Sequence, residues 1–354
     1  MGKYILVINP GSTSTKIAVY KDRLSLFEEK LTHSLEQLRT ASWEKQKELR
    51  KKEILQRLEN HQFSLQKLSA IAARGGLIKP VKSGTYLINQ QMIEDLKEAK
   101  RGNHASNLGA IIAKEIAEKL NIAAFIVDPV VVDEMEDIYR LSGMPILERT
   151  SIFHALNHKA TARRYAKEQG KRYENINLIV CHLGGGITVG AHQKGRVIDV
   201  NNALDGDGPM SPERSGSVPI GPLYRLILSG KYSFDEIRQM NVGSGGLVAY
   251  LGTNNAQEVI ERIKQGDQYA KTVIDAMIAQ IAKEIGAAAT VLKGDFEAIL
   301  ITGGLANESY IIDRLKKRIA FLGPIHIYPG ENEMEALALG VLQVLNGEVS
   351  AYIY

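Results

Sequence analysis

The strongest hydrophobic pattern lies near the start of the chain, where an apolar run over residues 4–8 is followed by a turn and a second apolar run over residues 17–20. Short apolar runs bounded by turn residues predict buried strands. Between them, Asn9-Pro10-Gly11 favours a tight reversal, because glycine tolerates positive φ and proline presets its own φ. The stretch therefore predicts a β-hairpin. Its tip is either a plain Ser/Thr-rich turn or a phosphate site built from hydroxyls, backbone N–H groups and one ammonium.

The same pattern returns half-way along the chain. Residues 177–196 align with residues 4–23 without a gap, so that each copy reads strand, glycine turn, strand. A third strand with a Gly-Gly turn covers residues 296–304 and opens a helix at Ser309. A duplicated hairpin indicates two similar domains that face one another and grip a ligand phosphate from both sides. A chance similarity between two strand–turn–strand units is the alternative.

The remaining pattern alternates apolar runs with helical spacing, which is typical of an α/β protein. The charged residues of the first long helix are expected to form a solvated face. Residues 202–219 are rich in Gly, Pro, Asp and Ser, so a long irregular loop is expected there. The expected strands cover 25–31, 68–73, 123–127, 296–302 and 324–329, and the longer expected helices cover 43–60, 86–100, 108–120, 267–293 and 333–345.

Several polar residues stand where an α/β sheet places its chemistry. Asp128 directly follows a predicted strand, a position that suits a site carboxylate, although Asp-Pro also starts ordinary turns. Arg74 precedes two glycines and Arg214 lies among small loop residues, so each either reaches an anion or is a solvated arginine. His154 and His158 have the i, i+4 spacing of zinc ligands, but no glutamate follows the first and no third ligand is apparent. We therefore expect a site His154 and a packed His158.

The composition narrows the function classes. A length of 354 residues suggests two domains, and a net charge of +4 without a basic block gives no sign of nucleic-acid binding. A single cysteine, Cys181, leaves no disulfide framework and no thiolate zinc cluster. Apolar runs of about 18 residues and a signal-peptide h-region are absent, so a cytoplasmic protein without membrane contact is expected. Neither GxxxxGK[ST] nor GxGxxG occurs, so any nucleotide site is of another kind.

Taken together, these motifs resemble those of the acetokinase family, the short-chain fatty acid kinases of the acetate and sugar kinase/Hsp70/actin superfamily. Residues 9–16 resemble the first phosphate loop, residues 182–186 the second, and residues 301–304 the adenosine loop. The resemblance covers nearly the whole chain. It implies an α/β fold of two duplicated actin/ribonuclease H-like domains with a nucleotide cleft between them. The N-terminal domain would cover 1–148, completed by the C-terminal helix 333–354, and the C-terminal domain 149–332 would carry the adenosine loop.

The resemblance also assigns site residues one by one. In one departure from the family pattern, Ile71 stands where acetate kinases carry a second site arginine, and we expect Arg74 to take over that role. Glu331 and Glu335 are close enough to Glu333 to leave the choice of metal-facing glutamate open. The implied catalytic residues are Asp128, Arg214, His154, His182 and Arg74; the phosphate- and nucleotide-binding residues are Asn9, Ser12, Ser14, Lys16, Gly184, Gly185, Gly186, Gly303 and Gly304; the acid pocket contains Ala73, His104 and Phe153; and the metal-facing residues are Asp128 and Glu333.

The implied reaction is reversible in-line phosphoryl transfer from ATP to a short-chain carboxylate, with Mg²⁺ as cofactor. The proline after Asn9, the Arg74-Gly-Gly and Asp128-Pro motifs and the chain length are more similar to the butyrate kinases of this family than to its acetate kinases. Ala73 replaces a bulkier valine, which leaves room for a longer acyl chain. Acetate, propionate or isobutyrate kinases remain alternatives, as does a non-enzymatic actin-like filament or regulator. The implied partners are ATP/ADP, the acid, and other copies of the chain in a homodimer or higher homo-oligomer.

Overall fold

The computed structural model describes residues 2–11, 13–34, 41–102 and 104–354. The chain folds into two compact units: unit 1 is Met1–Val132 with Asn332–Tyr354, and unit 2 is Asp133–Glu331. The boundary expected after residue 148 was wrong, because the segment after Val132 bonds within unit 2. The Glu136 N–H donates to the Ile198 carbonyl at 3.0 Å, and the Lys159 ammonium lies 2.5 Å from the Glu134 carboxylate.

Unit 1 contains a seven-stranded sheet in the order β12-β5-β6-β4-β1-β2-β3. The first three strands form an antiparallel meander, while β4 and β6 run parallel to β1. Their bounds are β1 Tyr4–Pro10, β2 Ser14–Lys21, β3 Leu24–Thr32, β4 Ala70–Ala73, β5 Thr85–Leu87, β6 Ala123–Val127 and β12 Tyr352–Ile353. The carboxyl ends of β1, β4 and β6 therefore meet at one edge of the sheet, which is where the chemistry of such sheets lies.

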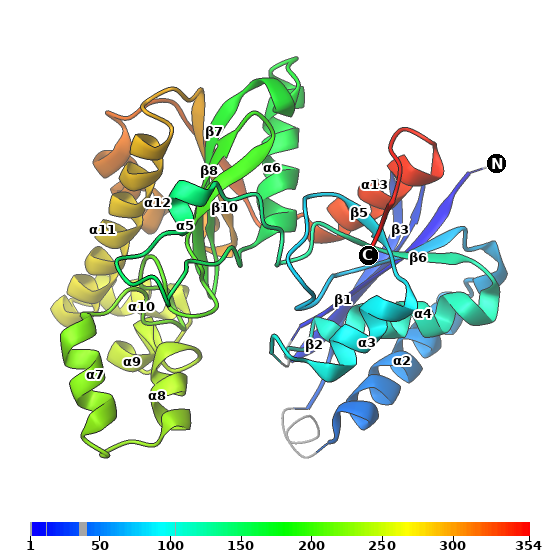
Figure 1. Ribbon diagram of the computed structural model, residues 1–354, viewed down its shortest axis with the longest axis horizontal. Helices are drawn as coiled ribbons and strands as arrows, with labels where there is room; N and C mark the ends of the chain where they lie inside the picture. The colour runs from blue at the N-terminus through cyan, green and yellow to red at the C-terminus, as the bar shows by residue number, and fades with distance from the viewer. Residues whose placement is uncertain (1, 12, 35–40, 103) are drawn as a thin grey trace. The chain divides into compact units, whose positions relative to one another are not determined.

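Helices cover both faces of this sheet (Figure 1). Helix α4 (Asn107–Leu120) packs on β1, β4 and β6 from one face, and α13 (Glu333–Leu345) packs on the same strands from the other. The helix expected over 86–100 was wrong at its start, because Tyr86 lies in β5. Helix α3 (Gln90–Glu98) begins after Asn89, whose side chain accepts the Met92 N–H at 2.9 Å and so caps the helix.

Helix α2 (Trp43–Asn60) has the expected bounds, but its charged residues are not all solvated. Lys47 is 7% exposed and Arg50 is fully buried. The prediction failed because charge density along a helix does not reveal a polar partner supplied by another element. Here the partners are Glu115 of α4 for Lys47 and the first hairpin turn for Arg50.

Unit 2 contains a five-stranded sheet in the order β11-β10-β7-β8-β9. Helix α6 (Ala155–Glu168) packs on β7 and β10, and α11 (Gln268–Val291) packs on β7, β8 and β9 from the opposite face (Figure 1). Strands β7, β8, β9, β10 and β11 cover Asn177–Leu183, Ile187–Gln193, Arg196–Val200, Ala298–Gly303 and Ile325–Pro329. The other helices are α5 Asp137–Arg140, α7 Ile220–Leu228, α8 Phe234–Asn241, α9 Gly246–Leu251, α10 Ala256–Lys264 and α12 Ser309–Ile319.

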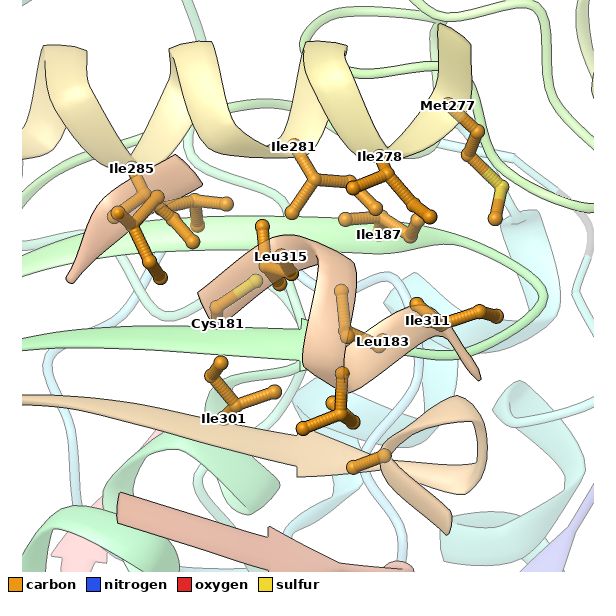
Figure 2. Packing of buried hydrophobic residues seen from close by; sticks show 14 of the residues in the cluster. Cys181, Leu183, Ile187, Met277, Ile278, Ile281, Ile285, Ile301, Ile311 and Leu315 are labelled. Carbon is orange, nitrogen blue, oxygen red and sulfur yellow. The ribbon is translucent and has the colours of Figure 1, made fainter. Parts of the chain in front are cut away.

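The core of unit 2 lies between its sheet and α11. Isoleucines of α11 that recur at helical spacing face the apolar side chains of the strands, and all are buried (Figure 2). This face includes Ile278, Ile281 and Ile285 from the helix and Cys181, Leu183 and Ile301 from the strands. Each of these side chains is fully buried, which explains why the long Ala- and Ile-rich segment forms a helix that the sheet holds in place.

The two sheets repeat one plan, which confirms the duplication. In each, an antiparallel three-strand meander is extended at its first strand by two parallel strands. The ungapped alignment does not hold across the turns, however. Pro10 pairs with Thr15 in the first hairpin, whereas Leu183 pairs with Ile187 in the second, so the second turn is one residue shorter. Turn length sets hairpin register, and sequence similarity of the strands does not reveal it.

Candidate functional site

The carboxyl-terminal edge of the unit 1 sheet gathers Asn9, Arg74 and Glu333, which we call the first cluster. The Asn9 side-chain amide donates to Glu333 Oε2 at 2.7 Å. The Arg74 guanidinium donates to the same oxygen at 3.1 Å and to Asn9 Oδ1 at 3.4 Å. Glu333 is 4% exposed and is the first residue of α13, where the helix dipole favours a carboxylate. The fold thus brings Arg74 into contact with Asn9 and Glu333, two other residues predicted for the site; its catalytic role stays a prediction.

Asp128 lies at the same sheet edge, directly after β6, and is 2% exposed. Its backbone adopts φ +38°, a region that non-glycine residues rarely occupy. The carboxylate Oδ1 accepts the Ser83 hydroxyl at 2.6 Å and the Gly84 N–H at 2.8 Å. A strained backbone held by specific hydrogen bonds is typical of functional positions and goes beyond an ordinary Asp-Pro turn.

The first phosphate loop comprises Gly11 and residues 13–16; the predicted site residue Ser12 lies outside the described residues. The Gly11 N–H donates to the Ser14 carbonyl at 2.7 Å. Lys16 is half-buried on β2 and pairs with Asn9 in the hairpin register, so the loop borders the first cluster. Arg50 of α2 donates to the Gly11 carbonyl at 3.0 Å and to the Ser14 carbonyl at 3.1 Å. We did not foresee this contact.

Two predicted site histidines stack on each other in unit 2. The His154 and His182 rings lie 3.8 Å apart between centroids and 15° from parallel. His182 Nδ1 is 2.9 Å from Asn157 Oδ1, and its Nε2 is 3.5 Å from Glu331 Oε1. His154 Nδ1 is 3.0 Å from the Thr188 hydroxyl. Both rings are therefore oriented by specific partners, at the start of α6 and at the end of β7.

Behind this pair lies a fully buried histidine network. His158 Nε2 is 2.8 Å from the Thr188 hydroxyl, its Nδ1 is 3.3 Å from His192 Nε2, and His192 Nδ1 is 2.7 Å from the Tyr173 hydroxyl. Burial pushes the pKa of both His158 and His192 well below the usual value, so both rings are neutral. His158 is packed, as expected. Sequence reasoning missed His192 and Thr188, for which the only signal is a polar residue inside an apolar strand.

The glycine turn at residues 184–186 meets Arg214 from the long loop. A Cβ added to Gly186 would lie 2.3 Å from Arg214 Nη1, so only glycine lets the guanidinium lie against the turn. The same nitrogen donates to the Ala203 carbonyl, and burial lowers the pKa of Arg214 without discharging it. The Ser211 hydroxyl donates to the Gly185 carbonyl at 2.6 Å, which fixes the loop on the turn.

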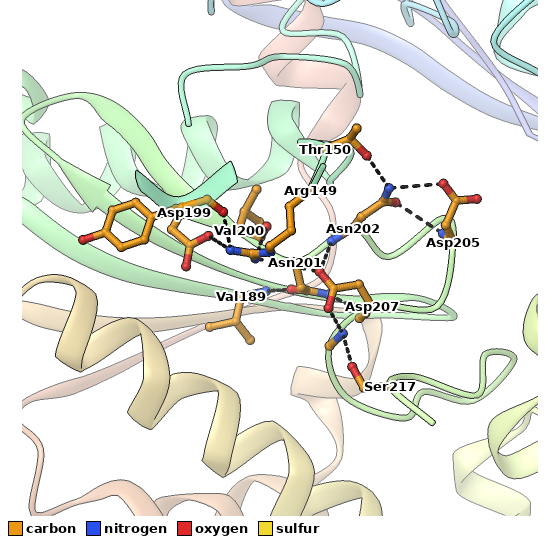
Figure 3. Close-up of polar contacts among 12 residues, drawn as sticks. Arg149, Thr150, Val189, Asp199, Val200, Asn201, Asn202, Asp205, Asp207 and Ser217 are labelled. Atoms are coloured by element: carbon orange, nitrogen blue, oxygen red, sulfur yellow. Dashed lines mark hydrogen bonds and ion pairs between the residues drawn. The ribbon is translucent and has the colours of Figure 1, made fainter. Parts of the chain in front are cut away.

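A polar network anchors the beginning of this loop to the sheet (Figure 3). Arg149 binds the Asp199 carboxylate at 2.8 Å, and Asn202 donates to the Thr150 hydroxyl at 2.8 Å. The Asn201 side chain accepts the Val189 N–H at 2.8 Å, as Figure 3 shows. It also donates to the Ile187 carbonyl at 3.0 Å. The loop was expected but these anchors were not, because their side chains resemble ordinary solvated residues in the sequence.

Gly303 ends β10 and Gly304 follows it, at the same edge of the unit 2 sheet as the residue 184–186 turn. Gly303 has φ +93°, and a Cβ there would lie 2.3 Å from the Leu183 carbonyl oxygen, so glycine is required. A Cβ on Gly304 would meet nothing within 4 Å. The bare backbone at Gly304 is compatible with the flat face of a nucleotide base.

The three residues predicted for the acid pocket lie in both units. Ala73 is fully buried in β4, between β1 and β6. His104 precedes α4 and lies 2.8 Å from the Ser106 hydroxyl. Phe153 belongs to unit 2, where its ring meets His158 edge-on at 5.2 Å between centroids. Their shared role as a pocket stays a prediction.

The described residues fit one kind of metal site. No group of three or more His, Cys, Asp or Glu side chains among them is arranged to hold a metal by itself. Asp128 and Glu333 supply buried carboxylate oxygens that already accept hydrogen bonds from the protein. This donor set suits Mg²⁺, which keeps several waters and is usually bound by one or two carboxylates together with nucleotide phosphates.

The fold defines the class of protein. It is similar to a propionate kinase from Francisella tularensis, with TM-score 0.79, 21% identity and coverage of 96% of this chain and 98% of that one. It is also similar to Porphyromonas gingivalis acetate kinase, with TM-score 0.81, 18% identity and coverage of 97% and 100%. At these identities the likeness shows the fold alone, the actin-like fold with two ribonuclease H-like units.

Sequence comparison is more specific. The family model described as Acetokinase family matches residues 145–352. Butyrate kinase 2 from Clostridium acetobutylicum is 53% identical over 351 residues, 99% of each chain. A probable butyrate kinase from Clostridium botulinum is 52% identical over 355 residues, covering 100% of both chains. The chain belongs to the acetokinase family. In the part of the chain that the structure describes, no helix is long and apolar enough to cross a membrane.

Proposed function

We propose that this protein is an ATP-dependent carboxylate kinase that makes butyryl phosphate and ADP from butyrate and ATP, reversibly. One observation carries the proposal: the full-length identity to proteins named butyrate kinases. The local geometry agrees with it, because cations and glycine turns gather at the carboxyl ends of strands in both units. The first cluster of unit 1, and His154, His182 and Arg214 of unit 2, are each assigned to nucleotide phosphates in this proposal.

The chemistry needs positioning and positive charge more than proton transfer. A carboxylate oxygen of the acid attacks the γ-phosphorus in line, the bond from that phosphorus to the bridging oxygen breaks, and ADP leaves with the electron pair. No proton moves, so no general base is required. Arg214, His182 and His154 stabilise the equatorial oxygens of the transferring group, and backbone N–H groups of residues 184–186 add to this.

Unit 1 residues hold the phosphates and the metal in this scheme. Asn9, Ser12, Ser14 and Lys16 surround the transferred phosphoryl group, and Arg74 orients Glu333 and Asn9 through the hydrogen bonds described above. Asp128 and Glu333 would hold Mg²⁺, and the ion would supply positive charge that stabilises the nucleotide phosphates. Gly303 and Gly304 lie against the adenosine.

Chain-length preference rests on the acid pocket. Ala73, His104 and Phe153 line the acyl chain in this proposal, and the small side chain of Ala73 leaves room for four carbons. One methylene in an apolar pocket is worth only about 1–3 kcal/mol, so acetate, propionate and isobutyrate are competing substrates rather than excluded ones.

The proposal extends to assembly and location. Unit 2 exposes large apolar side chains on the α7–α8 segment, including Ile220, Leu228 and Phe234 at 67%, 81% and 77% exposure. Such side chains support a homodimer or higher homo-oligomer. A reaction that consumes ATP and a free fatty acid supports a cytoplasmic location.

Acyl phosphate detection tests the function directly. The purified protein, MgATP and each linear acid from acetate to valerate, plus isobutyrate, are incubated with hydroxylamine, which converts acyl phosphates to hydroxamates. We expect the highest kcat/KM with butyrate. A higher kcat/KM with another acid would identify that acid, and not butyrate, as the preferred substrate. ATP hydrolysis without any acid-dependent hydroxamate would reject the kinase and favour an actin-like ATPase.

A further inference from the structure

We propose that Arg50, a buried arginine of α2, is a positioning residue that holds the first phosphate loop in its nucleotide-binding shape. The inference rests on the proposed function, because it assigns that loop to a nucleotide phosphate. Arg50 belongs to none of the motifs that carry the family resemblance.

The guanidinium spans the loop from end to end. Arg50 is fully buried, and its Nη2 donates to the Gly11 carbonyl at 3.0 Å. Its Nη1 donates to the Ser14 carbonyl at 3.1 Å and to the Thr15 hydroxyl at 2.7 Å. Gly11 and Ser14 also bond each other across the turn. A planar fork can satisfy three acceptors in one plane, whereas the single ammonium of a lysine cannot.

A second buried side chain completes this brace. The Thr15 hydroxyl, which accepts from Arg50, lies 2.8 Å from His33 Nε2 and can donate its own proton to that nitrogen. The His33 backbone N–H donates to the Thr13 carbonyl at 2.9 Å, and its Nδ1 lies 3.1 Å from Glu53 Oε2. Burial and the nearby Arg50 cation lower the pKa of His33, consistent with a neutral ring that accepts from Thr15. The loop is therefore fixed from α2 and from the segment after β3.

Packing alone does not explain a cation at this position. Burying a charge carries a large desolvation penalty, which an apolar residue of similar size would avoid. The hydrogen bonds from the guanidinium to the loop carbonyls offset this penalty, and they hold the loop in one conformation. The cation also lies directly behind a loop that binds an anion, where its field is little screened by water.

Lys47 offers a matched control on the same helix. It lies one turn before Arg50, is 7% exposed, and pairs with Glu115 at 2.5 Å rather than with the phosphate loop. The variants Arg50→Met and Lys47→Met each remove one buried cation from α2. Their difference isolates the contact with the loop from general loosening of the helix.

Calorimetric binding of MgADP, without any acid, measures the effect. Loss of hydrogen bonds from a charged donor predicts that Arg50→Met weakens nucleotide binding by about tenfold or more. The Lys47→Met variant should stay within about twofold of the unchanged protein, even if its melting temperature falls. Arg50→Lys should remain weak because it cannot form the fork. Under turnover, KM for ATP should rise in Arg50→Met while KM for the acid stays near its original value.

Chemical rescue separates positioning from stability. Methylguanidinium added to Arg50→Ala should tighten MgADP binding, while equal sodium chloride should not. Unchanged binding in Arg50→Met, or equal losses in the Arg50 and Lys47 variants, would overturn the proposal. If Arg50→Met does not fold, Arg50→Lys is the test. MgADP binding by Arg50→Lys equal to that of the unchanged protein would show that the loop does not need the planar guanidinium. Absence of MgADP binding in the unchanged protein would instead reject the proposed function.

Discussion

Single residues in this protein acquire their roles from partners far away in the chain. Asn9 and Glu333 are 324 positions apart and share a 2.7 Å hydrogen bond. Arg74 joins them, whereas Ile71, which replaces an arginine of the family pattern, is fully buried within β4. The arginine stands at the end of the strand instead of inside it, and this gives its guanidinium access to the sheet edge where the first cluster forms.

Gly186 gives the sharpest test of a single residue. Gly186→Ala should lower turnover by about 10²–10³-fold, because its methyl group would displace the Arg214 guanidinium and weaken electrostatic stabilisation of the transferring phosphoryl group. Gly143→Ala is the control, since a Cβ there meets nothing within 4 Å. The measurement is kcat for hydroxamate formation. An unchanged kcat in Gly186→Ala would show that Arg214 does not stabilise the transferring phosphoryl group.

At the level of elements, two hairpins with similar sequences differ in their turns and in what supports them. The first turn is braced by α2 through Arg50, and the second is covered by the loop that carries Arg214. His158 of α6 and His192 of β8 form a buried network behind the stacked pair of His154 and His182. A different segment of the chain thus supports each glycine turn, and neither segment is next to its turn in the sequence.

This buried network predicts acid sensitivity. In the unfolded chain His192 takes up a proton near pH 6.5, but burial keeps it neutral in the folded protein, where its pKa is well below that value. Below pH 6.5 the unfolded state therefore binds more protons, and stability contributed by His192 falls as pH decreases; above pH 7 this contribution is constant. His192→Gln, which keeps a partner for Tyr173, should have a smaller loss of melting temperature between pH 7 and pH 5.

Glu284 acts in the opposite direction over part of this range, because burial and nearby carboxylates raise its pKa to about 7. For this reason the informative quantity is the difference between His192→Gln and the unchanged protein at each pH. If the melting temperatures of the two proteins change by the same amount from pH 5 to pH 8, His192 titrates equally in the folded and unfolded states and the prediction is wrong.

At the level of the whole molecule, the last residues return to the first unit and support its site. Tyr354 donates from its hydroxyl to Asp95 at 2.5 Å and accepts the Lys79 N–H at 3.0 Å. The ring of Tyr352 packs against Gly84, whose N–H holds the Asp128 carboxylate. Tyr352 and Tyr354 therefore support the segment that holds Asp128, a predicted site residue.

Deletion of residues 352–354 tests this support. We expect a lower melting temperature and, at a temperature where the variant is fully folded, a several-fold lower kcat, because the Ser83–Gly84 segment no longer orients Asp128. Tyr354→Phe, which loses only the hydroxyl contacts, should show the smaller change of the two. Full kcat in the folded deletion variant would confine the role of the chain end to stability.

Local patterns in the sequence were sufficient for most of the elements and for the family. The expected bounds of α2, β6 and α13 match the structure, because each is set by spacing of apolar residues and by nearby turn residues. The glycine turns and the isolated arginines were sufficient to nominate most of the candidate site. Apolar spacing and turn residues are local features, so a short stretch of sequence is enough to recognise them.

Contacts between distant segments could not be read in this way. The short strands β5 and β12, the domain boundary at Val132, the length of the second turn and the burial of Arg50 all depend on which neighbour fills the space beside them. Arg74 and Arg50 are both single arginines in the sequence, yet one reaches the sheet edge and the other supports a loop from beneath. Hydrogen-bond partners and burial are properties of the assembled sheets and helices, so folding settles them and local composition does not.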